Sequence, residues 1–115
     1  MSLAFDGIRV LDFSQVIAGP VTSQLLRQLG AEVIKIESTV GDQMRGLFRG
    51  GREAPDQPSE AFATLNRGKR AIALDLKREE DAATMRELLA TADVFIHNVR
   101  KAGVERLGFG YDDVR

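Results

Sequence analysis

The chain has 115 residues, 16 Lys and Arg against 17 Asp and Glu, and no cysteine. This length predicts one domain at most, and the charge balance argues against a nucleic-acid-binding protein. The absence of cysteine excludes a disulfide scaffold, a thiolate zinc site, an iron–sulfur cluster and a cysteine nucleophile.

Nothing in the sequence predicts contact with a membrane. The longest uncharged stretch, residues 13–26, is shorter than the ~20 apolar residues that a bilayer-spanning helix needs. The first ten residues, MSLAFDGIRV, lack the basic and apolar regions of a signal peptide. We therefore expect a cytoplasmic protein.

The apolar residues in the first third of the chain predict a βαβ unit. Residues 8–13 and 33–36 are short apolar runs typical of strands. Between them, the small-residue turn at residues 18–20 precedes a helix that ends at Gly30, and two strands joined in this way form a parallel pair. A spacing of four predicts that the buried stripe of this helix consists of Val21, Leu25 and Leu29.

The next segment, residues 38–59, has no apolar periodicity and contains four Gly and two Pro. A segment of this kind that exceeds ~12–15 residues in a compact domain is usually functional or disordered. Residues 59–65 predict two helical turns that begin at Ser59 and bury Phe62 and Leu65.

The second half of the chain returns to alternating elements. Residues 71–76 predict a strand with Ile72, Leu74 and Leu76 on one face, and residues 94–96 predict another strand. Between these strands, residues 78–90 predict a helix with three acidic residues in its first turn. The predicted buried stripe of this helix comprises Met85, Leu88, Leu89 and Ala92. Four strands and their crossover helices predict an α/β fold with a Rossmann-like, open and mainly parallel sheet.

Three segments suit an anionic ligand. The turn at residues 18–20 places backbone N–H groups at a helix N-terminus. No G-x-G-x-x-G or P-loop motif is present, however, and a tight turn that needs small residues is the favoured explanation. Residues 66–70 place Arg and Lys around a glycine, which suits a phosphate, and a solvated turn is the alternative. Residues 98–103 follow a strand at the carboxyl edge of the sheet, where open α/β folds bind ligands, and an ordinary surface loop is the alternative.

The basic character of the second segment extends upstream. The basic residues between positions 45 and 70 are Arg45, Arg49, Arg52, Arg67, Lys69 and Arg70.

Two isolated titratable residues predict no catalytic centre. His97 is the only histidine, and we interpret it as structural because no nucleophile or metal-binding group accompanies it. Asp12, within the first strand, is interpreted as a turn or cap partner because no second group for acid–base chemistry is near it in the sequence.

A series of short motifs resembles the N-terminal part of the family III CoA-transferases, a superfamily that includes formyl-CoA and carnitine-type CoA-transferases and 2-methylacyl-CoA racemases. The motifs run in order along the whole chain. They are FDGIRVLDFS at 5–14, AGP at 18–20, LGAEVIKIE at 29–37, GD at 41–42 with Arg45, LNRGKR at 65–70, ALDLK at 73–77, ADV at 92–94 with Asn98, and ERLG at 105–108.

The resemblance implies that residues 1–115 are the N-terminal, CoA-binding part of a large domain that continues beyond Arg115. It implies an interlocked homodimer, with acyl-CoA and a carboxylic acid as substrates, no metal, and transfer of CoA through an aspartyl-CoA thioester. The nucleophile is expected downstream of Arg115, so this chain alone is expected to be inactive. The one-turn helix that the last five residues predict cannot stand alone, which also favours a truncated chain.

The resemblance also implies a set of CoA-binding residues. They are Ile17, Ala18, Asn66, Arg67, Gly68, Lys69, Asn98, Val99, Arg100 and Arg106. Some family members have Gln where this chain has Ile17, and that difference argues against oxalate/formyl-type chemistry.

Two alternatives remain open at this point. The chain could belong to a racemase that uses a His/Asp pair, although AGP at 18–20, rather than PGP, favours a transferase. It could also be a non-catalytic half-domain that binds CoA or a nucleotide.

Overall fold

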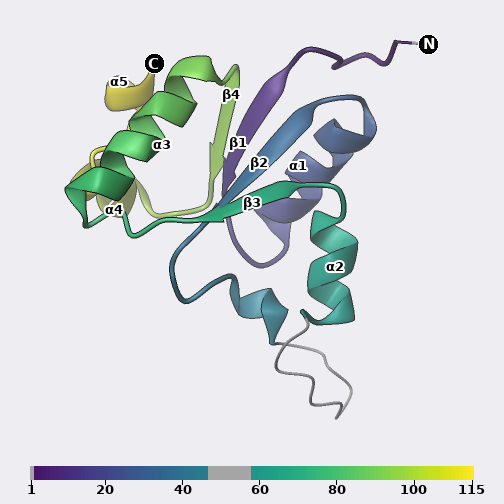
Figure 1. Cartoon of the computed structure of the whole chain (residues 1–115), viewed down its shortest axis with the longest axis horizontal. Helices are drawn as coiled ribbons and strands as arrows, with labels where there is room; N and C mark the ends of the chain where they lie inside the picture. Colours follow the sequence, from purple (N-terminus) through teal and green to yellow (C-terminus); the bar gives the residue numbers. More distant parts are fainter. Residues whose placement is uncertain (1, 47–57) are drawn as a thin grey trace.

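The computed structural model describes residues 2–46 and 58–115, which form a parallel sheet with helices on both faces (Figure 1). The strands are β1 (Arg9–Phe13), β2 (Glu32–Glu37), β3 (Arg70–Ala73) and β4 (Val94–His97), in the order β3-β2-β1-β4. All three strand pairs are parallel. The predicted Rossmann-like α/β class is therefore confirmed.

Helices connect the successive strands. The connecting helices are α1 (Ala18–Gln28), α2 (Glu60–Asn66) and α3 (Glu79–Thr91); the shorter elements are the 3₁₀ helix η1 (Gln43–Arg45), α4 (Lys101–Arg106) and α5 (Tyr111–Val114). α1 covers one face of the sheet, whereas α3 and α4 lie on the other (Figure 1).

The hydrophobic core is divided between these two faces because successive side chains of a strand point in opposite directions. Leu11 and Ile34 pack with Met85 of α3 in the larger cluster. Val10 and Val33 pack on the other face, against Leu26 of α1.

The predicted buried stripe of α1 is wrong. Val21, Leu25 and Leu29 are 37%, 55% and 46% exposed, and the buried residues of the helix are Gly19, Pro20 and Ser23. The reason is steric: a Cβ on Gly19 would lie 2.2 Å from Cβ of Ser14. Small residues let the start of α1 approach the sheet, and the side chains of the predicted stripe are left outside.

β3 is shorter than predicted. The strand ends at Ala73, although the N–H of Leu74 still donates to the carbonyl of Glu37 at 2.8 Å. β3 is an edge strand and all of its residues are exposed, so Ile72 does not share the burial of Leu74. The alternation of apolar residues predicts a strand, but it does not show whether that strand lies at the edge of the sheet. The exposure of Ile72 was therefore not predictable from it.

Two predicted helices are confirmed. α3 has its acidic residues in the first turn, and Met85 is fully buried. Ser59 is the N-cap of α2, where its hydroxyl accepts from the N–H of Phe62 at 3.1 Å. Phe62 is buried as predicted, whereas Leu65 is only partly buried.

Part of the long irregular segment lies outside the described residues. Positions 47–57 belong to this part, including Arg49 and Arg52 of the predicted basic cluster.

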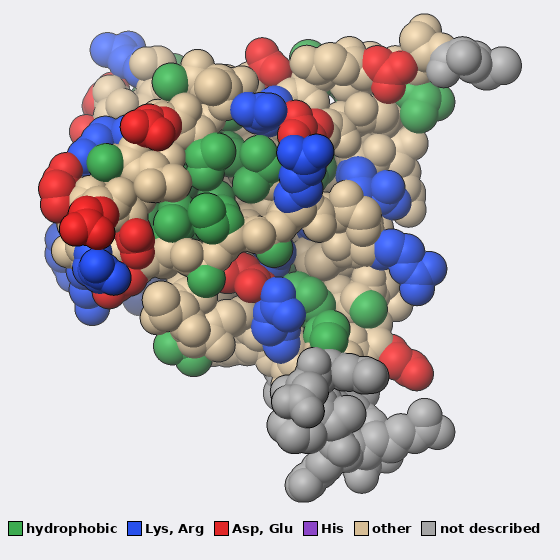
Figure 2. Space-filling view, in the orientation of Figure 1, with side chains coloured by type: hydrophobic (Ala, Val, Ile, Leu, Met, Phe, Trp, Pro, Cys, Tyr) green, Lys and Arg blue, Asp and Glu red, His purple; other side chains and the backbone are tan. Residues whose placement is uncertain are grey.

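One face of the molecule is partly apolar. Figure 2 shows hydrophobic side chains gathered over the sheet between α3 and β3. Within residues 2–46 and 58–115, no helix is long and apolar enough to cross a membrane.

Candidate functional site

Two of the segments predicted to bind CoA meet at the carboxyl edge of the sheet. The loop after β1 leads into Ile17 and Ala18, and the loop after β4 begins at Asn98. The side chain of Asn98 donates to the carbonyl of Gln15 at 2.7 Å and accepts from the N–H of Gln15 at 3.2 Å. This paired contact fixes the two loops side by side.

The third segment, residues 66–69, lies beside α1 rather than at the carboxyl edge. The side chain of Gln24 donates to the carbonyl of Arg67 at 3.1 Å. The ammonium group of Lys69 donates to the carbonyl of Pro20 at 3.0 Å and to the side chain of Asn66 at 2.8 Å. The turn is therefore attached to the first turn of the helix that follows Ile17.

Lys69 points into the protein. Its side chain is 1% exposed and forms an ion pair of 3.2 Å with the fully buried carboxylate of Asp12. Burial lowers the pKa of Lys69 below its usual value, and the charge of Asp12 opposes this shift. The expectation that Lys69 offers a surface charge to a phosphate is therefore not met here, and its place in the CoA-binding set stays a prediction.

Asp12 acts as the turn partner that the sequence predicts, and it also makes contacts outside that turn. Its carboxylate accepts from the N–H of Ser14 at 2.9 Å and from the hydroxyls of Ser14 and Ser23. Together with the contact from Lys69, these bonds give both carboxylate oxygens of Asp12 a partner, as a buried carboxylate requires. A carboxylate committed in this way is not an available nucleophile.

A second buried ion pair supports the loop after β1. Lys35 of β2 lies 2.9 Å from Asp42, and the two side chains are 1% and 0% exposed. Lys35 donates to the carbonyl of Ser14 at 3.0 Å, and Asp42 accepts from the N–H of Val16 at 3.2 Å. Val16 has φ +74°, a left-handed conformation that is strained for a β-branched residue.

The segment that carries Asp42 is itself attached to the sheet. Asp42 caps η1 by accepting from the N–H of Met44 at 2.9 Å. Arg45 forms two hydrogen bonds, of 3.0 and 2.8 Å, with Glu37 of β2, and its guanidinium lies 4.0 Å from the ring centre of Phe62. These contacts hold Asp42 against the buried face of β2.

The predicted residues therefore differ in what they can offer a ligand. The side-chain amides of Asn66 and Asn98 are occupied by the protein, so these residues hold turns in place and leave backbone groups for binding. Ile17 and Ala18 are exposed at the N-terminus of α1, where the first N–H groups have no partner within the helix. Arg100 is exposed at the N-cap of α4.

Three further members of the predicted set are Gly68, Val99 and Arg106. Gly68 has φ +82°, Val99 is partly buried, and Arg106 is exposed at the end of α4. In the described part of the chain no hydrogen bond or ion pair links Arg106 to the other predicted residues.

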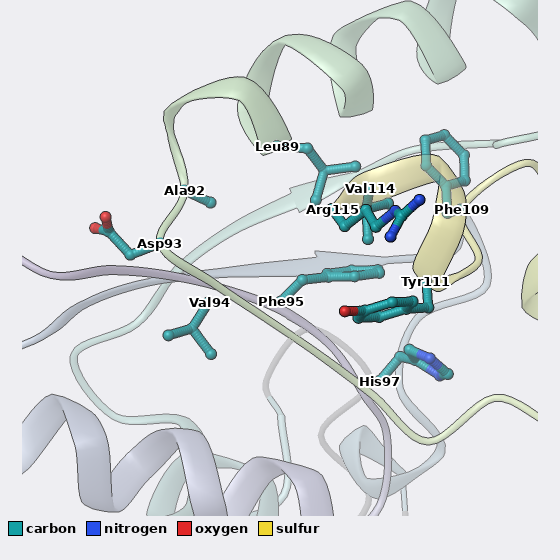
Figure 3. Close-up of a pocket in the computed structure, with 10 residues that line it drawn as sticks. All are labelled: Leu89, Ala92, Asp93, Val94, Phe95, His97, Phe109, Tyr111, Val114 and Arg115. Carbon is teal, nitrogen blue, oxygen red and sulfur yellow. The ribbon is translucent and has the colours of Figure 1, made fainter.

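A cavity of about 320 Å³ lies elsewhere, between the end of α3, β4 and α5 (Figure 3). Figure 3 shows the side chains of Leu89, Phe95, Tyr111 and Val114 converging on it. His97 lies at one side, and its Nδ1 atom is buried with no hydrogen-bond partner in the described residues. None of the predicted CoA-binding residues lines this cavity.

Across residues 2–46 and 58–115, no group of three or more His, Asp or Glu side chains is placed to hold a metal ion.

Sequence reasoning missed Lys35, Asp42 and Glu37 as parts of this arrangement. The signal was present, because Lys35 and Glu37 alternate with isoleucines within a strand and so share one face. Two charged residues on the covered face of a strand need charged partners, and the Gly-Asp turn and Arg45 provide them.

The chain is similar to known proteins over nearly all of its length. Residues 5–115 match the family described as CoA-transferase family III. The chain belongs to this family. It is 42% identical over 115 residues to a formyl-CoA:oxalate CoA-transferase from Streptomyces avermitilis, covering 100% of this chain and 27% of that protein.

Another relative is named for different carboxylic acids. A succinate–glutarate CoA-transferase from Agrobacterium fabrum is 38% identical over 113 residues, which cover 95% of this chain and 28% of that protein. The crystal structure of a CAIB/BAIF family protein from Brucella suis superimposes with a TM-score of 0.91 at 35% identity, covering 99% of this chain and 30% of that one. This chain therefore spans little more than a quarter of the length of its curated relatives.

Proposed function

We propose that the complete protein is a CoA-transferase that moves CoA between carboxylic acids, and that residues 1–115 supply its CoA-binding N-terminal part. The observation that carries this proposal is the junction of Gln15 and Asn98, which brings two of the predicted CoA-binding segments together at the carboxyl edge. Open α/β folds bind ligands at this edge. The names of the relatives favour the same chemistry.

The reaction requires a nucleophile, and the family resemblance implies an aspartate downstream of Arg115 that forms a thioester with CoA. Asp12 is unsuited to this role because it is buried and bonded on both oxygens. The proposed task of the present chain is to hold acyl-CoA, through backbone groups of Ile17 and Ala18 and the cationic side chains of Arg100 and Arg106.

The complete protein is also proposed to be an interlocked homodimer. The exposed apolar side chains of Val21, Leu25 and Leu29 support this, since surfaces of this kind are usually covered by another part of the protein or by a partner. Light scattering of the complete protein tests it, and a monomer at micromolar concentration would contradict it.

The activity is tested by incubating the complete protein with an acyl-CoA and a different carboxylic acid. We expect the new acyl-CoA to appear, and treatment with hydroxylamine during turnover to leave a hydroxamate on one aspartate beyond Arg115. Solvent deuterium at the carbon next to the thioester, with no new acyl-CoA, would instead identify a racemase. Failure of CoA to bind at all would refute the proposal.

The binding role is tested by Arg106→Ala and Arg100→Ala in the complete protein. Loss of an exposed cation that contacts phosphate is expected to raise KM for acyl-CoA by roughly tenfold with a smaller change in kcat. Arg86→Ala is the matched control, because Arg86 is an exposed arginine of α3 that, within residues 2–46 and 58–115, pairs only with Glu79. Equal kinetics for all three variants would refute the assignment of both arginines.

A further inference from the structure

The loop after β1 has a strained conformation that the buried residues around it maintain. Val16, with φ +74°, directly precedes Ile17 and Ala18. Valine is disfavoured in this region, and a residue remains there only when its surroundings hold it. Such strain concentrates at functional sites, which indicates a functional role for the residues that hold Val16 in this conformation.

The carbonyl of Ser14, two residues before Val16, and the N–H of Val16 itself are held by a residue of β2 and by the N-cap residue of η1. Lys35 donates to the carbonyl of Ser14 at 3.0 Å, and the carboxylate of Asp42 accepts from Val16 at 3.2 and 3.4 Å. The 2.9 Å ion pair between Lys35 and Asp42 joins these two contacts into one unit. Both side chains are buried, so the pair cannot contact CoA itself.

We propose that Lys35 and Asp42 are positioning residues, which hold Val16 in its left-handed conformation and thereby present the backbone of Ile17 and Ala18 to acyl-CoA. This inference rests on the proposed function. Without the pair, the loop relaxes toward an ordinary conformation, and only a fraction of the molecules is competent to bind. The apparent Kd for CoA rises by the inverse of that fraction.

The test measures the binding of CoA to the complete protein by isothermal titration calorimetry. Lys35→Met combined with Asp42→Ser removes both charges together, so that neither is left buried without a partner. Serine retains the cap on η1, because its hydroxyl can still accept from Met44. We expect Kd to rise about tenfold, the scale set by the strain of one left-handed valine, with the binding stoichiometry unchanged.

Adding Val16→Gly distinguishes positioning from general damage. Glycine adopts positive φ without strain, so it needs no ion pair to hold it there. We expect the triple variant to bind CoA within about twofold of the unsubstituted protein. A raised Kd that Val16→Gly does not restore overturns the proposal, as does a lowered stoichiometry at unchanged Kd.

The control is Arg9→Met with Glu32→Gln, which removes the ion pairs of Glu32 with Arg9 and Arg70 at the other end of the same two strands. Its Kd is expected to equal that of the unsubstituted protein, and an equal rise in Kd would overturn the proposal. If the variant with Lys35→Met and Asp42→Ser does not fold, the single variant Asp42→Asn is measured in its place. Asparagine loses the pairing with Lys35 but keeps one accepting oxygen, so a smaller rise that Val16→Gly reverses is expected, and no rise overturns the proposal.

This design separates two failures. If the unsubstituted complete protein does not bind CoA, the proposed function is refuted, and the inference with it. If the protein binds CoA and the variants bind equally well, only the inference is refuted.

Discussion

The two ends of the β1–β2 strand pair carry ion pairs of very different kinds. At the amino end, Arg9 and Glu32 lie 2.9 Å apart with about a third of each side chain exposed. At the carboxyl end, Lys35 and Asp42 lie equally close but are almost completely buried. Exposed ion pairs contribute little to stability, whereas burying two charges costs desolvation free energy. This cost is present at the carboxyl end and is largely absent at the amino end.

The left-handed positions at the two ends differ in the same way. At the amino end, the turn into β2 uses Gly30, for which φ +110° carries little strain. At the carboxyl end, Gly41 has φ +88°, but a valine, Val16, is left-handed as well. The amino end therefore leaves its ion pair partly exposed and its left-handed backbone at glycine, whereas the carboxyl end retains strain and buried charge where ligands of open α/β folds bind.

The largest expected effect comes from breaking the buried network at the carboxyl end. Asp12→Ala leaves the ammonium of Lys69 without its counter-charge and removes the acceptor for two serine hydroxyls. We expect the free energy of unfolding of the complete protein to fall by about 3–5 kcal/mol. Urea denaturation measures this, and a loss below 1 kcal/mol would show that the network matters no more than a surface contact.

A smaller loss is expected from Gly30→Ala at the amino end. A Cβ there would lie 2.4 Å from a carboxylate oxygen of Asp6 and 3.0 Å from the backbone nitrogen of the same residue, in a strained backbone conformation. We expect a destabilisation of roughly 1–3 kcal/mol by urea denaturation. Gly46→Ala is the control, because its Cβ would meet no atom within 4 Å and its φ is −105°.

The pH dependence of stability sharpens the comparison further. Because burial lowers the pKa of Lys69 in the folded protein, the unfolded chain binds more protons between that value and the usual one of 10.5. Stability therefore rises with pH across this window, and the cost of the buried charge is fully present below it. Relative to Lys69→Met, the unsubstituted protein is expected to gain stability as the pH increases toward 10.5, and parallel pH curves would contradict this.

The smallest effect is expected from the exposed pair. Arg9→Met with Glu32→Gln is expected to change the free energy of unfolding by less than about 1 kcal/mol, and less still in high salt. Thermal unfolding at low and high ionic strength measures it. A loss as large as that of Asp12→Ala would remove the distinction between the two ends.

Much of the fold was predictable because its signals are local. The alternation of short apolar runs with helical segments predicted the parallel α/β sheet, and Ser59 predicted the start of α2. The burial of α1 was not predictable in this way. A spacing of four identifies an apolar stripe, but whether that stripe or the small face with Gly19 and Ser23 meets the sheet depends on what lies beneath.

The candidate site was likewise predictable only in part. The sequence placed Asn98 after a strand, and so at the carboxyl edge of a parallel sheet, without any structure. It did not indicate that the amide of Asn98 is used on Gln15, or that the ammonium of Lys69 turns inward to Asp12. These contacts join residues 83 and 57 positions apart, and spacing along a chain carries no information about such pairings.

The amino-acid sequence by itself therefore determined the fold class, the order of the elements and the family resemblance, because periodicity, caps and motifs are written in neighbouring residues. Only the tertiary structure decided which charges are buried. Lys35 meets Asp42 through the loop that follows β2, and Lys69 meets Asp12 because the turn before β3 contacts the start of α1. The physical reason is that a charge is paired or solvated according to what surrounds it in space, and those surroundings exist only once the strands have assembled.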